Sequence, residues 1–234
     1  MKYLSFLIRV LVAKVDILFA LHLNRHKYNK NMITEFEYSL RRQFLKTNQQ
    51  FGTTDFYQNY PPLMISGKRD SLCRFAMYGL SQKVNSNTML LDIGGNIGFF
   101  SAYISQFVKQ VDIVEQNKSL TQVCKQLLKH QAISNVDVYN ADFKEFTPNK
   151  KYDIVFSLAI HKWVELDFQE YLNKIRTYLN TGGLLLMESH LLFSLQGEDL
   201  EPQLKRCEHF ELVEKGQIDD HEGAIREFFW LKAL

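Results

Sequence analysis

The chain has 234 residues, of which 46% are hydrophobic and 23% are charged, and its formal net charge is +2. This length and composition exclude a fibrous or disordered chain, and the near-neutral charge argues against DNA and disfavours RNA as a partner. The 3 cysteines are scattered and form no C-x-x-C pattern, which argues against disulfides and a thiolate metal site and indicates a cytoplasmic, reducing compartment.

The first segment, residues 1–23, is mostly apolar but is interrupted by Lys2, Arg9, Lys14 and Asp16. A membrane-spanning helix needs about 20 consecutive apolar residues, so we expect no span here. On a helix, most of these charges fall on one narrow stripe. Two interpretations stay open: a helix lying on the inner face of a membrane, or a helix packed on the protein's own core or a second subunit.

Residues 1–80 are predicted to form a helical N-terminal extension, and residues 81–234 a second, larger domain. Thr34 and Glu37 have the spacing of a capping box, which places the start of a helix at Thr34. A loop containing Gly and Pro follows, and a short helix is expected at residues 70–78.

From about residue 88, apolar segments of strand length alternate with helical segments. We expect strands at residues 89–93, 111–114, 136–139, 152–158 and 184–187. The helices between them are expected at residues 97–107, 119–132 and 168–179. Two further apolar segments, at residues 210–213 and 225–231, have no helix between them and predict an antiparallel hairpin. The alternation predicts an α/β fold with a parallel sheet.

The sharpest functional signal is LLDIGGNIGFF at residues 90–100, a buried strand that leads through a Gly-rich turn into a helix. Gly94, Gly95 and Gly98 allow a ligand to approach the backbone beyond the end of the strand. A dinucleotide fingerprint would read G-x-G-x-x-G, and Asp92 would repel a pyrophosphate. S-adenosylmethionine (SAM) has an ammonium, a sulfonium and no phosphate, so the spacing favours SAM.

The same segment resembles motif I of the class I SAM-dependent methyltransferases, D-x-G-x-G-x-G, with Asn96 at the middle glycine. The resemblance implies a Rossmann-like fold with a seven-stranded, mostly parallel sheet, a C-terminal antiparallel hairpin, and S-adenosylhomocysteine (SAH) as product. It implies that Glu115 accepts from the ribose hydroxyls and Asp142 from the adenine amine. The cofactor-binding residues implied in this part of the chain are Asp92, Gly94, Gly95, Asn96, Gly98, Glu115, Gln116, Asp142, Phe143 and Ser157.

Two histidines are candidates for the catalytic base. His161 lies just beyond the fourth expected strand and His190 just beyond the fifth, so their loops are expected to face each other across the methyl group. Glu188 is expected to orient an imidazole or to touch the acceptor. Trp163 either stacks on a sugar or base or packs against the sheet. Ordinary loop positions for these side chains are the alternative.

Upstream, FYQNYPPLMISGKR at residues 56–69 resembles the segment before motif I in two methyltransferase groups. One is found with bacterial surface-polysaccharide enzymes, and the other methylates RNA 5′-phosphates. In the second group such Tyr and Arg residues approach the SAM carboxylate or the acceptor phosphate. The resemblance therefore implies that Tyr57 and Arg69 bind the acceptor and that Arg74 binds SAM; a surface helix position is the alternative for Arg74.

The sequence as a whole predicts a SAM-dependent methyltransferase that O-methylates a glycan, a lipid-linked sugar or a small metabolite. Methylation of a phosphate or RNA end is the first alternative, and a non-catalytic methyltransferase-like scaffold is the second. A nicotinamide oxidoreductase is disfavoured by the glycine spacing. The chain has no D/N-P-P-Y motif, which argues against amino-group methylation of bases and glutamine. No ligand spacing supports a metal, and the oligomeric state stays open.

Overall fold

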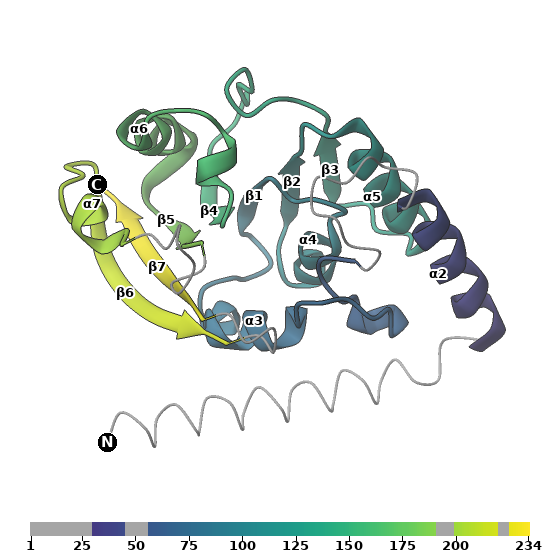
Figure 1. The fold of residues 1–234 in the computed structure, drawn as a ribbon. Helices are drawn as coiled ribbons and strands as arrows, with labels where there is room; N and C mark the ends of the chain where they lie inside the picture. Colours follow the sequence, from purple (N-terminus) through teal and green to yellow (C-terminus); the bar gives the residue numbers. More distant parts are fainter. Residues whose placement is uncertain (1–29, 45–55, 191–198, 220–224) are drawn as a thin grey trace.

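The computed structural model describes residues 30–44, 56–190, 199–219 and 225–234 (Figure 1). The segment at residues 1–23, with its predicted membrane contact, lies outside these residues. Among the described helices, none has the length and apolar character needed to cross a membrane.

The core of the molecule is a 7-stranded sheet with the order β3-β2-β1-β4-β5-β7-β6. The five strands β3, β2, β1, β4 and β5 pair in parallel, and β7 joins β5 and β6 antiparallel. This confirms the predicted fold class. The strands are β1 Met89–Ile93, β2 Gln110–Val114, β3 Val136–Tyr139, β4 Tyr152–Leu158, β5 Leu179–Glu188, β6 Phe210–Ile218 and β7 Arg226–Ala233.

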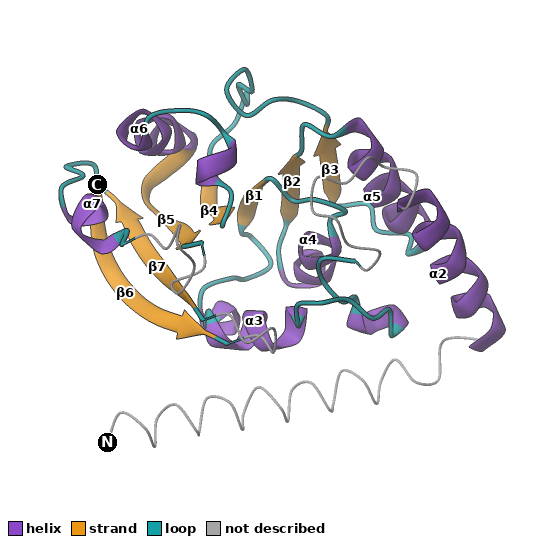
Figure 2. Ribbon diagram, in the orientation of Figure 1, coloured by secondary structure: helices purple, strands orange, loops and turns teal. Residues whose placement is uncertain are grey.

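Helices cover both faces of this sheet (Figure 2). One face packs against α2 (Lys30–Phe44), α3 (Ser71–Met77), α4 (Phe99–Ile104) and α5 (Lys118–His130). The other packs against α6 (Phe168–Tyr178) and α7 (Glu201–Lys205). Short 3₁₀ helices lie at η1 Pro61–Leu63, η2 Leu80–Gln82, η3 Ser105–Phe107 and η4 His161–Trp163.

Alternation along the strands decides which side chains reach which face. Leu90 and Leu186 belong to the cluster packed on α4 and α5, whereas Leu91 and Leu185 belong to the cluster packed on α6. By the same alternation Glu188, two residues beyond Leu186, points to the face that α3 covers. Because the strands are parallel, their carboxyl ends lie side by side, and several polar side chains from distant parts of the chain meet there.

The first described helix differs from the prediction at its start. The helix α2 already includes residue 30, so Thr34 lies inside the helix and is not its N-cap. Glu37 instead accepts a hydrogen bond of 2.8 Å from Nε of Arg41, one turn later. Its neighbour Phe36 stacks on His130 of α5, with ring centroids 3.6 Å apart. The described part of the extension thus packs on the domain, and a boundary at residue 80 stays a prediction.

One other boundary differs from the prediction, and one predicted helix is confirmed. The strand β5 begins at Leu179 rather than at residue 184, so Gly182 and Gly183 lie inside the strand. The helix predicted at residues 70–78 is confirmed as α3, because Asp70 caps it by accepting from the amides of Leu72 and Cys73.

Candidate active site

The turn between β1 and α4 keeps the geometry of a glycine-rich loop although its middle glycine is replaced. Gly94, Asn96 and Gly98 have φ values of 70°, 55° and 74°. Asn is one of the few residues besides glycine that adopts this left-handed conformation routinely. A Cβ at Gly98 would lie 2.3 Å from Sγ of Cys124, so this position is closed to larger residues. Gly95 is restricted in the same way, since a Cβ at this position would lie 2.5 Å from the side chain of Ile113.

Substitutions at Asn96 test whether its backbone angle matters more than its side chain. Asn96→Gly is expected to change the affinity for SAH by less than about fivefold, since glycine adopts the same φ freely. Asn96→Val is expected to lower it about tenfold or more, because a β-branched residue is strained by ~1–2 kcal/mol at positive φ. Calorimetric titration measures both. An equal loss in the two variants would instead assign the effect to the amide side chain.

Two buried acids flank this turn. Asp92 accepts a hydrogen bond of 2.5 Å from the hydroxyl of Ser101 in α4. Burial raises the pKa of Asp92 to about 6, against the opposing effects of Ser101 and the positive charge of Arg74. Glu115 follows β2 and accepts from the backbone amides of Asn96 and Asn117 at 3.0 and 2.9 Å. Burial also raises the pKa of Glu115.

A cleft with about 340 Å³ of empty space opens at the carboxyl ends of the parallel strands. Its lining brings together six residues that the sequence predicted as part of the site: Gly94, Glu115, Gln116, Asp142, Phe143 and Trp163. Phe143 is buried against the rings of Tyr171 and Tyr178, and Asp142 accepts from the amide of Lys144 at 2.8 Å. Trp163 is 50% exposed at the rim, so it does not pack flat against the sheet.

Ser157, predicted to contact the cofactor, lies near the carboxyl end of β4. Its side chain is fully buried on the α6 face, and its hydroxyl shares a hydrogen bond of 2.9 Å with the hydroxyl of Tyr171. Asp92 and the glycine-rich turn that leads into α4 lie on the opposite face of the sheet. The hydroxyl of Ser157 is thus a structural group, and only its backbone is left for the predicted cofactor contact.

His161 and His190 do face each other, as the topology predicted. Their ring centroids are 4.9 Å apart and their planes are inclined by 60°. Burial, together with the charges of His161, Lys162 and Arg226, lowers the pKa of His190 to about 4. Among the described residues, Nε2 of His190 is buried without a hydrogen-bond partner. The pair therefore offers at least one neutral imidazole at physiological pH.

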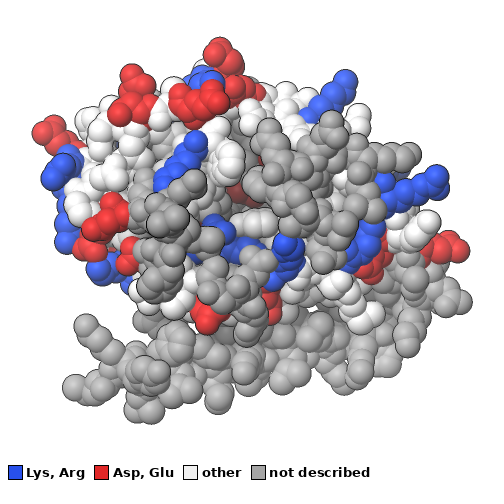
Figure 3. Space-filling view, in the orientation of Figure 1, with Lys and Arg blue, Asp and Glu red and all other residues white. Residues whose placement is uncertain are grey.

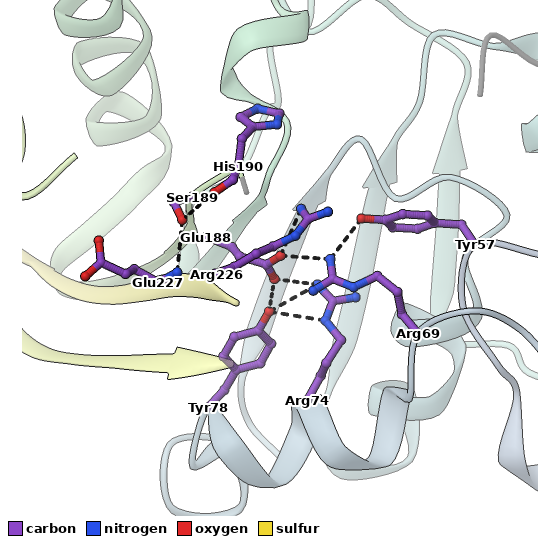
Figure 4. A network of polar contacts seen from close by, with 9 residues as sticks. All are labelled: Tyr57, Arg69, Arg74, Tyr78, Glu188, Ser189, His190, Arg226 and Glu227. Atoms are coloured by element: carbon purple, nitrogen blue, oxygen red, sulfur yellow. Dashed lines mark hydrogen bonds and ion pairs between the residues drawn. The ribbon is translucent and has the colours of Figure 1, made fainter. Parts of the chain in front are cut away.

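Glu188 is surrounded by arginines (Figure 4). Its carboxylate lies 2.8 Å from Arg69, 2.8 Å from Arg74 and 3.2 Å from Arg226, and it also accepts from the hydroxyl of Tyr78. Burial alone would raise the pKa of Glu188, but Arg74, Arg69 and Arg226 outweigh it and hold the pKa well below its usual range.

These contacts correct two expectations. Glu188 is fully buried and its oxygens accept from arginines, so we assign it a positioning role rather than the predicted catalytic one. Arg74 is fully buried as well, which excludes the surface position that was its alternative. Tyr57 and Arg69, predicted together as acceptor-binding residues, are joined by a hydrogen bond of 2.8 Å.

Sequence reasoning did not name Tyr78 and Arg226 as site residues. Tyr78 carried a weak signal, because it follows Arg74 at the i+4 position and so faces the same way from α3. Arg226 carried no such signal in the sequence. It reaches Glu188 only because β7 lies antiparallel beside β5, with Phe228 opposite Glu188.

Figure 3 shows the surface of this part of the molecule. Basic side chains gather near the middle of the face in view, beside a hollow in which atoms of acidic side chains are visible.

Comparison with known proteins shows the family of the chain. A family model described as AdoMet dependent proline di-methyltransferase matches residues 45–209, which is more than half of the chain. The chain belongs to this family of class I SAM-dependent methyltransferases.

Similar curated proteins are also methyltransferases. The ribosomal RNA small subunit methyltransferase A of Malacoplasma penetrans is 27% identical over 144 residues, which is 62% of this chain and 48% of that protein. The malonyl-[acyl-carrier protein] O-methyltransferase 1 of Ilyobacter polytropus is 25% identical over 173 residues, or 70% and 61% of the two chains. The chain thus spans about half to three fifths of the length of these relatives.

Solved structures share the fold at low identity. The N-methyltransferase NodS from Bradyrhizobium japonicum WM9 has a TM-score of 0.56 and 14% identity, covering 69% of this chain and 96% of its own. A SAM-dependent methyltransferase from Geobacter sulfurreducens, solved with SAH, has a TM-score of 0.57 and 11% identity, with coverage of 69% and 90%. At this identity the likeness concerns the fold alone.

The described residues fit SAM as the cofactor. The cleft offers Glu115 and Asp142 to polar groups, and apolar walls at Phe143 and Ile160 to a flat ring. Asp92 supplies a carboxylate for an ammonium, and Arg74 has a buried Nη1 without a hydrogen-bond acceptor among the described residues. This arrangement matches a ligand that carries a nucleoside and an amino-acid group.

Proposed function

We propose that this methyltransferase methylates a hydroxyl oxygen of a glycan, a lipid-linked sugar or a small metabolite. The proposal rests on the pair of imidazoles at the carboxyl ends of β4 and β5. SAM, when bound, supplies a methyl group on a sulfonium. The acceptor then gains a carbon–oxygen bond and gives up its hydroxyl proton, which requires a base in the protein.

The histidine pair is suited to take that proton. A pKa of about 4 keeps His190 neutral above about pH 5, and its buried Nε2 is not satisfied by any described residue. His161 is buried 4.9 Å away, ring centre to ring centre, so the two imidazoles bound one small space. General-base catalysis of this kind is worth about 10²–10⁴-fold in rate.

Single substitutions of the two histidines test the proposal. His161→Gln and His190→Gln are each expected to leave the affinity for SAH within about twofold and to lower turnover by about 10²-fold or more. His209→Gln, at an exposed position, is the matched control. Turnover is measured as transfer of labelled methyl from SAM to a panel of glycans, sugar phosphates and hydroxyl metabolites.

Each outcome has a distinct meaning. Unchanged turnover in both variants would contradict a base role for the pair. Failure of the unmodified protein to bind SAH would instead favour the non-catalytic scaffold.

Methylation of an amine is the second candidate, because the matching family is described by proline di-methylation. An amine also gives up a proton when it is methylated, so the same imidazoles would serve. The names of the two curated relatives point to ribosomal RNA and to malonyl-[acyl-carrier protein], which select no single acceptor. A peptide with an N-terminal proline belongs in the same panel, and mass spectrometry of the product distinguishes N- from O-methylation.

A further inference from the structure

Trp163 holds a large aromatic ring at the rim of the cleft that opens beyond β1 and β2, where it is 50% exposed. We propose that this indole covers the nucleoside of the bound cofactor, and so serves cofactor binding rather than recognition of the acceptor. The proposal goes beyond the proposed function, because it concerns how SAM and SAH are held and does not depend on the identity of the acceptor.

The other residues of this cleft mark it as the nucleoside end of the site. Glu115 and Asp142, which the family resemblance assigns to the ribose hydroxyls and the adenine amine, line it together with Trp163. His190 and Glu188 are both among the described residues, and neither contributes to that lining. Trp163 therefore lies on the side of the nucleoside and not on the side of the imidazole that we assign to the acceptor.

The turn that carries Trp163 is anchored on the rest of the site. The amide of Trp163 donates a hydrogen bond of 2.8 Å to the carbonyl of Ile160, which forms the turn of η4. The side chain of Ile160 lies against Gly94, since a Cβ at that glycine would be 2.5 Å from it. His161 and Val164, on the same turn, are buried. The backbone of Trp163 is thereby held in place while its ring stays half exposed.

A second aromatic residue approaches the cleft from its other side. Phe143 follows β3 and Trp163 follows β4, and in the sheet the strands β2 and β1 lie between these two. The ring of Phe143 is fixed, because it packs edge to face on Tyr171 and Tyr178 with centroids 5.4 and 5.9 Å away. The cleft beyond β1 and β2 is thus flanked by one fixed aromatic residue and one half-exposed one, which suits a flat purine ring.

One lysine joins the two loops that carry these rings. Nζ of Lys144 lies 3.3 Å from the carboxylate of Glu165, two residues after Trp163, and 3.7 Å from that of Asp142. An exposed ion pair of this kind contributes little to stability. It shows instead that the loops after β3 and β4 come within reach of each other, so that a ligand in the cleft is enclosed by both.

An indole at this position gains from a base in the cleft. Aromatic side chains stack on nucleobases through their faces, and this contact needs no particular hydrogen-bonding edge. The nucleoside is the same in SAM and SAH. We therefore expect Trp163 to strengthen the binding of both ligands to the same extent, and to leave discrimination between them to other residues.

Affinities of variants test the contact. Trp163→Ala is expected to weaken binding of SAH at least about fivefold, the lower end of what base–aromatic stacking contributes. The affinity for 5′-methylthioadenosine, which has the nucleoside without the amino-acid group, should fall by the same factor. Calorimetric titration measures SAH, and competition against SAH measures the nucleoside. Tyr38→Ala, at an exposed aromatic residue of α2, is the matched control and should leave both affinities unchanged.

Fluorescence gives a readout that a merely structural role would not change. The chain has 2 tryptophans, and Trp230 is fully buried with its Nε1 donating to the carbonyl of Tyr78 at 2.9 Å. Emission that responds to the cleft therefore comes from Trp163. Saturation with SAH is expected to change this emission and to protect it from quenching by acrylamide. Trp163→Phe, which keeps an aromatic face, should abolish the response while SAH affinity stays within about threefold.

The outcomes separate the role of Trp163 from the proposed function. Unchanged SAH affinity in Trp163→Ala would overturn the proposal, as would a loss for SAH that 5′-methylthioadenosine does not share. Bound SAH without any change in emission or acrylamide quenching would overturn it as well. An unmodified protein that does not bind SAH would instead contradict the methyltransferase function itself.

Discussion

Replacing Glu115 with alanine is expected to weaken the binding of SAH at least about a hundredfold. Glu115 directly follows β2 and lines the cleft. Its buried carboxylate already accepts hydrogen bonds from the backbone amides of Asn96 and Asn117. Hydrogen bonds to a charged group are worth about 1.5–3 kcal/mol each, and the family resemblance assigns this carboxylate to both ribose hydroxyls. Two such bonds correspond to about 10²–10⁴-fold in affinity, measured by calorimetric titration with SAH.

The control for this experiment is Glu211→Ala, an exposed glutamate on β6. It is expected to leave SAH affinity unchanged. Glu115→Gln, which keeps the shape but removes the charge, is expected to lie between alanine and the unmodified protein. Full SAH affinity in Glu115→Ala would refute the ribose role.

Replacing Glu188 with glutamine is expected to destabilise the protein by about 3–5 kcal/mol, the usual cost of removing one partner of a buried ion pair. The substitution leaves three guanidinium groups without their carboxylate, two of them with fully buried side chains. For a chain of this size the loss corresponds to a fall in Tm of about 6–20 °C. Thermal unfolding followed by circular dichroism measures it.

The matched control is Glu214→Gln, which removes a partly exposed ion pair with Lys83 at 2.9 Å. Such pairs contribute about 1 kcal/mol or less. A stable Glu188→Gln protein with lost turnover would restore the catalytic role that we exclude.

The pH dependence follows from the same contacts. Because the arginines hold the pKa of Glu188 below its ordinary value of 4.5, the folded state binds this proton less readily than the unfolded state. The stabilisation is therefore present above about pH 4.5 and is lost as the pH falls toward the lowered pKa. The difference in stability between the unmodified protein and Glu188→Gln should shrink at acid pH.

The cofactor half of the site was predictable because its geometry is local. Asp92, the glycines and Asn96 lie on one strand–turn–helix unit, where residue type and spacing largely determine the backbone path. The φ of 55° at Asn96 shows that the altered motif still forms the same turn. The order of strands and helices follows from hydrophobic periodicity, and it correctly placed His161 and His190 at neighbouring strand ends.

The cluster of arginines around Glu188 was only partly predictable, because it depends on contacts between residues that are far apart in the sequence. Arg69 and Arg74 reach Glu188 across separations of 119 and 114 residues. The sequence marks these residues as candidates, yet it assigned Glu188 to catalysis. No local signal shows that a carboxylate will be enclosed by arginines from a loop, a helix and an antiparallel strand.

For this protein, then, the sequence by itself determined the methyltransferase fold, the cofactor and the residues of the glycine turn. These rest on short-range periodicity and backbone conformation. Only the tertiary structure decided which charged groups meet: that Ser157 bonds Tyr171, that Glu188 is an ion-pair partner, and that Arg226 joins the site. The physical reason is that charge balance in a buried site is set by strand register and helix docking, which the local sequence does not encode.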